Sequence, residues 1–335
     1  MMSKLTIQFY PSKGLPEIFR QTIQKLIEQF QDAPMPETPN NSLVFVPMLD
    51  KKAVGYASVT IHQKSAHISS IFIHPEHQGN LAGFKLVLDI VDKLSKTDCQ
   101  KISLNCSEKL LSFFQALGFN TTRELIQYNK NSSGKYFEVE NPCPAFFLET
   151  LKHTLKTNSL SLKTLKNSHK LLRLSHDKQH YQYTTRNQFL AFHRNMLSQA
   201  QRQIWIISDN ITSPLLNDEV VRDSLLRLAK RNPKAEIRIL LEDDKKGAGH
   251  YNPTIELSQR LTSFIEIRTI QTGVKKPNEM ITTVDFTAGI HRKNLTNYTG
   301  FAHYNNYLAA QRLRDKFELY WQYAKPSMQL RRLSI

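Results

Sequence analysis

The chain of 335 residues is long enough for two domains of ordinary size, and its 40% hydrophobic content suffices for packed cores. No stretch of 18 apolar residues occurs and the first residues lack a signal-peptide core, which argues against a membrane span and predicts a cytoplasmic protein. The net charge of +16 is uneven: residues 1–130 hold 14 Lys/Arg and 11 Asp/Glu, a net +3, and residues 131–335 hold the remaining 31 and 18, a net +13.

Two strands are predicted near the start of the chain. The apolar runs at residues 43–49 (LVFVPML) and 53–61 (AVGYASVTI) flank the polar residues 50–52, which is typical of two paired strands joined by a turn. Gly55 is expected to mark a bend in the second strand, because glycine weakens a regular strand.

The most informative stretch is residues 68–88, ISSIFIHPEHQGNLAGFKLVL. Its apolar beginning predicts a buried strand that ends before Pro75, which has no backbone donor. From Ala82 the apolar residues follow a helical period. Gly79 and Gly83 lie in the turn, where glycine lets the backbone approach a ligand closely. A strand that leads through such a turn into a helix gathers free N–H groups and a positive dipole end, which suits a pyrophosphate.

Three further elements follow this helix. Lys101–Asn105 is a predicted strand, Glu108–Leu117 a helix ended by Gly118, and residues 123–128 a final strand. This order predicts an α/β domain with a mixed central sheet flanked by helices.

The turn from Gln78 to Gly83 resembles the acyl-CoA loop of the GNAT acetyltransferases, which reads Gln/Arg-x-x-Gly-x-Gly/Ala. The preceding His-Pro-Glu, the following Phe-Lys-Leu and the later segment SFFQALGF fit the same family, whereas Leu81 stands where the family prefers glycine. The resemblance covers roughly residues 3–130. It implies a GNAT fold and an N-acyltransferase that passes the acetyl group of acetyl-CoA directly to a primary amine, on a small molecule or a protein.

The resemblance also implies which residues bind acetyl-CoA. The backbone of the strand Ile71, Phe72 and Ile73 would pair with the pantetheine arm. The N–H groups of the turn would hold the pyrophosphate: Gln78, Gly79, Asn80, Leu81, Ala82 and Gly83.

The residues that would move protons are not identified by the sequence. The family often has a tyrosine as proton donor in the helix before the Gly-Phe ending, where this chain has Phe114. Ser107 stands where an asparagine is common. Four residues are candidates for the base, and none has a specific pattern around it: Glu76, His74, His67 and His62. The catalytic residues therefore stay unassigned.

The three cysteines indicate no special chemistry. Cys99, Cys106 and Cys143 have neither the spacing of metal ligands nor that of a disulfide framework. We therefore expect no metal site and a reducing, cytoplasmic setting.

The first domain is predicted to end near residue 140. Residues 129–144 are polar and contain one glycine and two prolines, which is typical of a domain end. Residues 141–180 then form a basic linker, which is either a solvated spacer or an arm that binds a polyanion.

The second domain, residues 181–335, shows strands alternating with helices, which predicts a mostly parallel sheet. Helices are expected at 185–200, 218–230, 254–261 and about 303–323, and strands at 203–208, 235–241, 264–269 and 280–285.

The order and the segments QIWIISDNI, RNPKAEIRILLED, IEIRTI and DKFELYW resemble one half of a phospholipase-D-like domain. Active members carry His-x-Lys, four residues and Asp, with the histidine as nucleophile. If Asp285 is that aspartate, the other positions hold Asn278 and Met280, and no second motif exists. The resemblance implies a catalytically inactive phospholipase-D-like sandwich. Bacterial proteins are known to fuse a GNAT domain to such a domain. An anion cleft could be lined by Arg238, Lys245, Arg268 or Arg292.

Three hypotheses about function follow. The first is an acyl-CoA-dependent N-acyltransferase whose second domain recruits substrate or regulates. The second is a binding protein with a degenerate GNAT fold, altered at Leu81 and Phe114, whose basic half binds nucleic acid or another polyanion. The third is a phosphodiesterase, which Asn278 and Met280 argue against. The positive charge could also be merely solvated surface.

Overall fold

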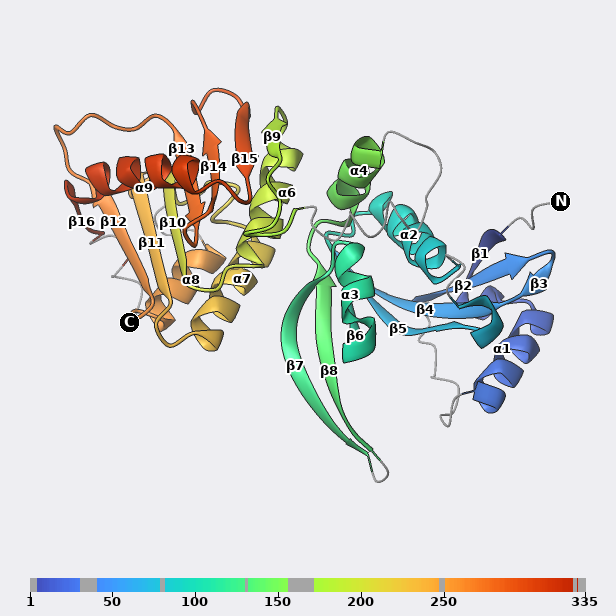
Figure 1. Ribbon diagram of the computed structural model, residues 1–335. Coiled ribbons are helices and arrows are strands. Elements are labelled where there is room, and N and C mark those ends of the chain that lie inside the picture. The colour runs from blue at the N-terminus through green and yellow to red at the C-terminus, as the bar shows by residue number, and fades with distance from the viewer. Residues whose placement is uncertain are drawn as a thin grey trace. The chain divides into compact units, whose positions relative to one another are not determined.

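The computed structural model describes residues 5–30, 41–78, 82–129, 132–155, 172–246, 251–327 and 330. The chain divides into two compact units, Met1–His169 and Lys170–Ile335, and each has its own sheet. Figure 1 labels the helices and strands of both units. No helix within the described ranges is long and apolar enough to cross a membrane.

The first unit is built on a mixed sheet with the strand order β1-β2-β4-β5-β6-β8-β7, and β3 pairs with β2. Neighbouring strands are antiparallel except β5 and β6, which run parallel. The strands are β1 (Leu5–Pro11), β2 (Ser42–Leu49), β3 (Lys52–Ala53), β4 (Gly55–His62), β5 (Ser65–Ile73), β6 (Lys101–Ser107), β7 (Asn120–Asn129) and β8 (Ser132–Asn141). The helices are α1 (Glu17–Phe30), α2 (Ala82–Ser95), α3 (Glu108–Ala116) and α4 (Pro144–Leu155), with short 3-10 turns η1 (Ser12–Gly14) and η2 (Pro75–His77).

Helices α1 and α2 cover opposite faces of this sheet (Figure 1). Side chains from α1, β2 and β4 form a buried apolar cluster on the α1 face: Leu15, Ile23, Ile27, Val44, Val46, Met48 and Tyr56. Phe72 of β5 packs against this cluster, whereas the next residue, Ile73, lies beside Gly83 of α2. Successive side chains of a strand point to opposite faces, so β5 contributes to both cores.

Two local predictions in this unit are confirmed. β2 and β4 form the expected antiparallel pair, and the turn that follows β2 holds Asp50 and Lys51 at positive φ. Gly118 follows α3 with a φ of +82°, and its N–H donates to the carbonyl of Gln115. This is the left-handed helix end that glycine favours.

Gly55 has a different role from the bend that we expected. It is the first residue of β4 and lies opposite Ile73. A Cβ atom at this position would collide with the carbonyl oxygen of Phe72. The glycine therefore permits a close approach of β4 and β5.

Residues 129–144 contain a strand, not the polar domain end that we expected. Strand β8 lies between β6 and β7 and pairs with both. Val139, Glu140 and Asn141 are all buried at the end of β8, which the polar composition of the segment obscures. The expected linker over 141–180 begins with α4, which packs against α2, and its residues 156–171 lie outside the described residues.

The second unit has a sheet with the order β16-β12-β11-β10-β13-β14-β15-β9. Its strands are β9 (His180–Tyr183), β10 (Gln203–Asn210), β11 (Glu236–Asp243), β12 (Ile265–Ile270), β13 (Met280–Val284), β14 (Ala288–Arg292), β15 (Gly300–His303) and β16 (Ala324–Pro326). Its helices are α6 (Arg186–Leu197), α7 (Glu219–Arg231), α8 (Pro253–Arg260) and α9 (Tyr307–Trp321).

The expectation of a mostly parallel second sheet is wrong. Strand β11 runs parallel to β10 and β12, but the other neighbours in the sheet are antiparallel. Helices α7 and α8 provide the crossovers that parallel strands need, whereas β13, β14 and β15 follow one another without a helix. The last helix is also shorter than expected, because residue 303 belongs to β15.

Helices α9 and α6 bury opposite faces of this second sheet. Trp205 of β10 and Ile281 of β13 pack in one cluster with Phe317 of α9, which lies across the strands in Figure 1. The neighbour of Ile281, Thr282, faces the other way, and its hydroxyl lies 2.9 Å from Nε2 of His193 on α6.

Candidate functional site

The parallel strands β5 and β6 pair over only part of their length. Their register contains four pairs, from Ser65 opposite Lys101 to Ile68 opposite Leu104. Strand β5 continues to Ile73 without further pairing to β6, whose other edge pairs with β8 from Ile102 to Ser107. The side of β5 that faced β6 therefore becomes an open edge over residues 69–73.

A β-bulge lies where this open edge begins. Val59 of β4 pairs with Ile68, but the preceding Ser58 pairs with Ser70, so Ser69 is an extra residue in β5. Its hydroxyl lies 3.2 Å from that of Thr60. A bulge bends its strand and increases the local twist, which accounts for the divergence of β5 from β6.

Two of the three predicted strand residues direct backbone groups at the open edge. The N–H of His74 donates to the carbonyl of Val54, 2.9 Å away, so His74 faces β4. Because backbone groups alternate sides along an antiparallel strand, Ile73 and Ile71 face the open edge and Phe72 faces β4. The carbonyl of Ile73 already accepts a hydrogen bond of 2.8 Å from Nε2 of Gln78.

The helix α2 begins at the carboxyl end of this open edge. A Cβ atom at Gly83, in its first turn, would lie 3.7 Å from Ile73 of β5 and 3.8 Å from Phe113 of α3. The first turn of a helix has N–H groups without intrahelical partners and the positive end of the dipole. The structure thus brings Ile73, Gln78, Ala82 and Gly83 together, while residues 79–81 (Gly79, Asn80 and Leu81) lie outside the described residues.

The turn η2 contains a cluster of His74, Glu76 and His77, whose side-chain donor atoms lie within 4.8 Å of one another. Nδ1 of His74 accepts a hydrogen bond from the N–H of Glu76, so the proton of the neutral ring is on Nε2. A metal at Nε2 would displace that proton and break the turn's hydrogen bond. Glu76 is also exposed, so the cluster is better explained as turn structure than as a metal site.

The four candidate bases lie at different ends of the strands. His74 caps η2 and Glu76 lies within it, close in sequence to the start of α2. His62 is an exposed residue at the end of β4. His67 lies within β5, half-buried, and its Nδ1 is 3.0 Å from Oγ of Ser103 on β6. This partner could not be predicted from local sequence, because 36 residues separate the two.

Phe114 belongs to the core. It is 1% exposed and makes edge-to-face contacts with Phe113 and Phe119. A tyrosine here would place its hydroxyl in an apolar layer, so the chain's departure from the tyrosine pattern fits its packing.

The three positions that we aligned with a phospholipase-D motif do not form a common site. The carboxylate of Asp285 accepts hydrogen bonds from the N–H groups of residues 201–203, which precede or begin β10. Asn278 and Met280 lie at the other end of β13, where the N–H of Asn278 donates to Glu242. Asp285 is therefore a structural cap.

The four cations proposed to line an anion cleft have separate environments. Arg238 pairs with Glu236 and Glu318, and Arg268 pairs with Glu266. The guanidinium of Arg292 donates to the carbonyls of Leu295 and Asn297. Lys245 is an exposed residue in the turn after β11. These contacts support individual structural roles more than a shared anion site.

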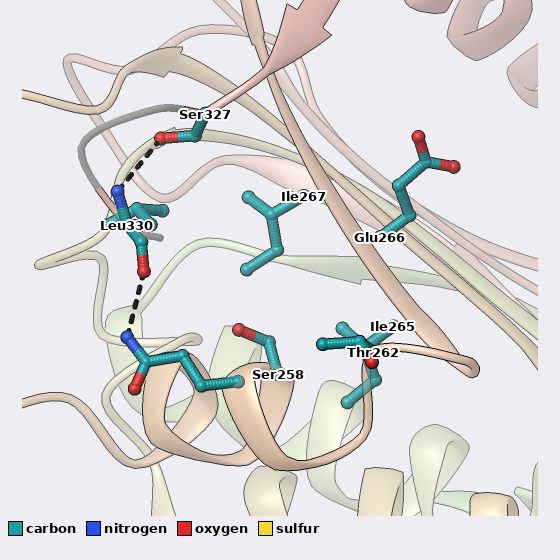
Figure 2. Close-up of a pocket in the computed structure, with 8 residues that line it drawn as sticks. Ser258, Thr262, Ile265, Glu266, Ile267, Ser327 and Leu330 are labelled. Carbon is teal, nitrogen blue, oxygen red and sulfur yellow. Dashed lines mark hydrogen bonds between the residues drawn. The ribbon is translucent and has the colours of Figure 1, made fainter. Parts of the chain in front are cut away.

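A cavity of about 230 Å³ lies in the second unit (Figure 2). Its lining comes from α8, β12 and the C-terminal segment: Ser258, Gln259, Thr262, Ile265, Glu266, Ile267, Ser327 and Leu330. Nε2 of Gln259 donates a hydrogen bond of 2.8 Å to the carbonyl of Leu330, which Figure 2 labels. None of the residues implicated above lines this cavity.

Two families match the chain, one for each unit. Residues 14–134 match the acetyltransferase (GNAT) domain, which confirms the expected identity of the N-terminal domain. Residues 185–333 match a domain of unknown function (DUF7931). The resemblance of the second unit to a phospholipase-D-like half therefore stays a prediction.

Two curated proteins show local similarity to the chain. "GCN5-related N-acetyltransferase 2, chloroplastic" of Arabidopsis thaliana is 35% identical over 79 residues, 23% of this chain and 31% of that protein. Glucosamine 6-phosphate N-acetyltransferase of Trypanosoma brucei brucei is 32% identical over 75 residues, 20% of this chain and 51% of that protein. The chain thus spans a third to a half of the length of these relatives.

Solved structures are similar over the N-terminal part. The ribosomal-protein-S18-alanine N-acetyltransferase of Escherichia coli has a TM-score of 0.36 and 19% identity, covering 42% of this chain and 94% of that one. A GNAT family acetyltransferase of Elizabethkingia anophelis with acetyl-CoA bound has a TM-score of 0.32 and 13% identity, covering 41% and 97%. These scores are too low to carry an argument about function.

Proposed function

We propose, on the premise that residues 14–134 form a GNAT acetyltransferase domain, that this enzyme transfers the acetyl group of acetyl-CoA to a primary amine. The observation that carries the proposal is the open edge of β5, which ends at the N-terminus of α2. Unpaired strand groups suit the amides of a pantetheine arm, and a helix N-terminus suits a pyrophosphate. The open edge of β5 leads to the N-terminus of α2, just as the pantetheine arm of acetyl-CoA leads to its pyrophosphate.

The cosubstrate would be held mainly by backbone groups. Ile71 and Ile73 would bond the pantetheine arm, and the turn from Gln78 to Gly83 would bond the pyrophosphate. The side chain of Gln78 fixes the turn to the strand through the Ile73 carbonyl. Acetyl-CoA supplies an activated thioester carbonyl, so the protein's contribution is to position the amine and accept its proton.

We expect acetyl-CoA to bind with micromolar affinity and the Gly83→Glu variant to lose roughly 100-fold or more of that affinity. A carboxylate in the first turn of α2 would repel the pyrophosphate, and like charges placed together cost several kcal/mol. Gly83→Ala is the matched control: its Cβ would lie 3.7 Å from the nearest side-chain atom, an ordinary contact, so its affinity is expected to change little. Isothermal titration calorimetry measures both.

The test has a clear negative outcome. If the wild-type chain binds neither acetyl-CoA nor longer acyl-CoAs, the proposal fails. Equal affinity of wild type and Gly83→Glu would place the cosubstrate elsewhere. Circular dichroism of each variant distinguishes a lost site from a lost fold.

The second unit is proposed to recruit the substrate or to regulate the enzyme, without phosphodiesterase activity of its own. Its support is indirect: it forms a separate compact unit, Lys170–Ile335, and residues 131–335, which include it, hold +13 of the net charge of +16. The alternative is a binding protein whose basic half holds nucleic acid.

The alternative predicts a steep salt dependence. Each neutralised phosphate releases counterions, so four contacts would weaken binding on the order of 100-fold between about 50 and 200 mM salt. Fluorescence anisotropy with a labelled DNA duplex measures this. Weak binding that does not depend on salt would argue against the alternative and show that the positive charge is merely solvated surface.

A further inference from the structure

A row of polar side chains crosses the first sheet on its α1 face. Thr60 of β4 is paired with His67, His67 with Ser103, and Ser103 with Glu140 of β8. Cross-strand partners point to the same face. Thr60 lies on the face of Tyr56, because the two are four residues apart in one strand and Tyr56 belongs to the cluster against α1. His67 is therefore on the α1 face, opposite to α2.

His67 occupies the closed end of the open edge. It immediately precedes Ile68, the last residue that β5 pairs with β6, and it lies two residues before the bulge at Ser69. The start of α2 is at the other end, beside Ile73. Five residues of strand separate Ile68 from Ile73, about 17 Å at the usual rise. An acetyl-CoA whose pyrophosphate lies at α2 and whose arm follows β5 would bring its thioester toward His67.

The ring of His67 is held with one nitrogen available. Nδ1 is 3.0 Å from the Ser103 hydroxyl, and Nε2 bonds to none of the residues that the structure describes. The carboxylate of Glu138, half-buried on β8, acts on the ring electrostatically. A neutral ring that is fixed at one nitrogen and open at the other can accept a proton.

We propose that His67 is the base that takes the proton of the acceptor amine, and that Ser103 positions it. This inference rests on the proposed acetyl transfer. The amine nitrogen attacks the thioester carbonyl, the new C–N bond forms, and the C–S bond breaks. The proton released by nitrogen passes to Nε2 of His67, and the CoA thiolate leaves and takes a proton from water. The Glu138 carboxylate favours an acceptor that arrives as a cationic ammonium, which loses its extra proton to water before the amine nitrogen attacks.

The other candidate bases are placed less suitably. His74, which caps η2, and Glu76, within η2, lie at the pyrophosphate end of the edge. His62 is paired with Ser65 at the far end of β4 and is exposed. Only His67 among the four combines a fixed ring with a position where β5 and β6 separate.

Burial keeps the His67 ring neutral near pH 7, against the charge of Glu138. Burial lowers the pKa of His67 from its usual 6.5, Glu138 works to raise it, and His62 works to lower it. Lys101 and Glu140, on the neighbouring strands, form an ion pair of 3.6 Å with each other. A base with a lowered pKa is unprotonated at neutral pH, and turnover should fall as pH drops through that pKa.

The test uses the full chain, with spermidine as the probe amine and CoA release as the signal. His67→Gln is expected to bind acetyl-CoA as tightly as wild type, to lose roughly 100-fold in kcat, and to lose the acid limb of the pH profile. His62→Gln, the matched control, should keep kcat and an acid limb, with the limb moved only slightly to higher pH because His62 helps to lower the pKa of His67. Ser103→Ala should lower kcat and move the acid limb, and Ser103→Thr should restore both, because threonine keeps the hydroxyl.

A second readout does not depend on the choice of acceptor. Nitrogen-15 NMR of the histidine rings is expected to show the His67 signal, identified by its loss in His67→Gln, shifting when acetyl-CoA binds. A His67 signal that acetyl-CoA leaves unmoved would overturn the proposal, as would an unchanged kcat and acid limb in His67→Gln. Failure of acetyl-CoA to bind at all would instead count against the proposed function.

Discussion

The second unit is expected to lose stability as the pH falls from about 6.5 to about 4, because two buried histidines must stay neutral in the fold. His193 is 1% exposed and His303 is 2% exposed. Burial lowers the pKa of His193 to about 4, although the Phe189 carbonyl and Asp218 work to raise it. Burial, assisted by His180, also lowers the pKa of His303 to about 4.

The direction follows from proton linkage. Between pH 6.5 and 4 each histidine is protonated in the unfolded chain but neutral in the folded one, so acid favours unfolding. Stability is fully present above pH 6.5 and falls until about pH 4. The difference between a pKa of 6.5 in the unfolded chain and about 4 in the folded one lowers the free energy of unfolding by about 3 kcal/mol per histidine. The total free energy of unfolding of a domain is roughly 5–15 kcal/mol. The second unit should therefore approach unfolding near pH 4.

Urea unfolding at a series of pH values measures this effect. The chain's two tryptophans, Trp205 and Trp321, both belong to the second unit, so their fluorescence reports on that unit alone. His193→Gln should reduce the pH slope of the unfolding free energy, whereas His176→Gln, at an exposed position, should leave it unchanged. An unfolding free energy that is constant from pH 7 to 4 would contradict the prediction.

Local signals in the sequence predicted several elements of the first unit. The strand that ends at Ile73, the helix from Ala82 and the glycine end at Gly118 depend on hydrophobic period, on proline and on backbone conformation. These causes act within a few residues and can be recognised in one sequence.

The predictions that proved wrong concern strands whose pairing depends on distant segments of the chain. Strand β8 is polar in composition and is recognisable as a strand only beside β6 and β7. The antiparallel half of the second sheet likewise needs the partners of β13, β14 and β15 to be known. In the candidate site, the same limit applies to His67, which is distinguished from three other candidates by Ser103 on a neighbouring strand. Side-chain periodicity carries no information on such partners.

Gly300→Ala is expected to destabilise the second unit by about 3 kcal/mol. Gly300 belongs to β15, with β14 on one side and β9 on the other. A Cβ atom there would collide with the carbonyl oxygen of His291 and with the ring hydroxyl of Tyr183. The carbonyl is backbone within a paired strand and cannot move without disturbing the sheet, and Tyr183 is 1% exposed, so rotation of its side chain has a cost in packing. Tryptophan fluorescence in urea measures the loss.

The matched control is Gly273→Ala. Its φ of +91° disfavours alanine, but a Cβ atom there would meet no atom within 4 Å. Gly273→Ala should lower the free energy of unfolding by about 1–2 kcal/mol, through backbone strain alone. A loss for Gly300→Ala no larger than this would show that the strands adjust to the added methyl group.

The double variant Gly300→Ala/Tyr183→Phe separates the two collisions. The Tyr183 hydroxyl is buried and hydrogen-bonds to none of the described residues, so Tyr183→Phe alone should cost little. If the hydroxyl is the main obstacle, its removal should recover much of the loss caused by Gly300→Ala. If the His291 carbonyl dominates, the double variant should be as unstable as Gly300→Ala. We expect the second result, because a side chain can rotate whereas a paired backbone cannot.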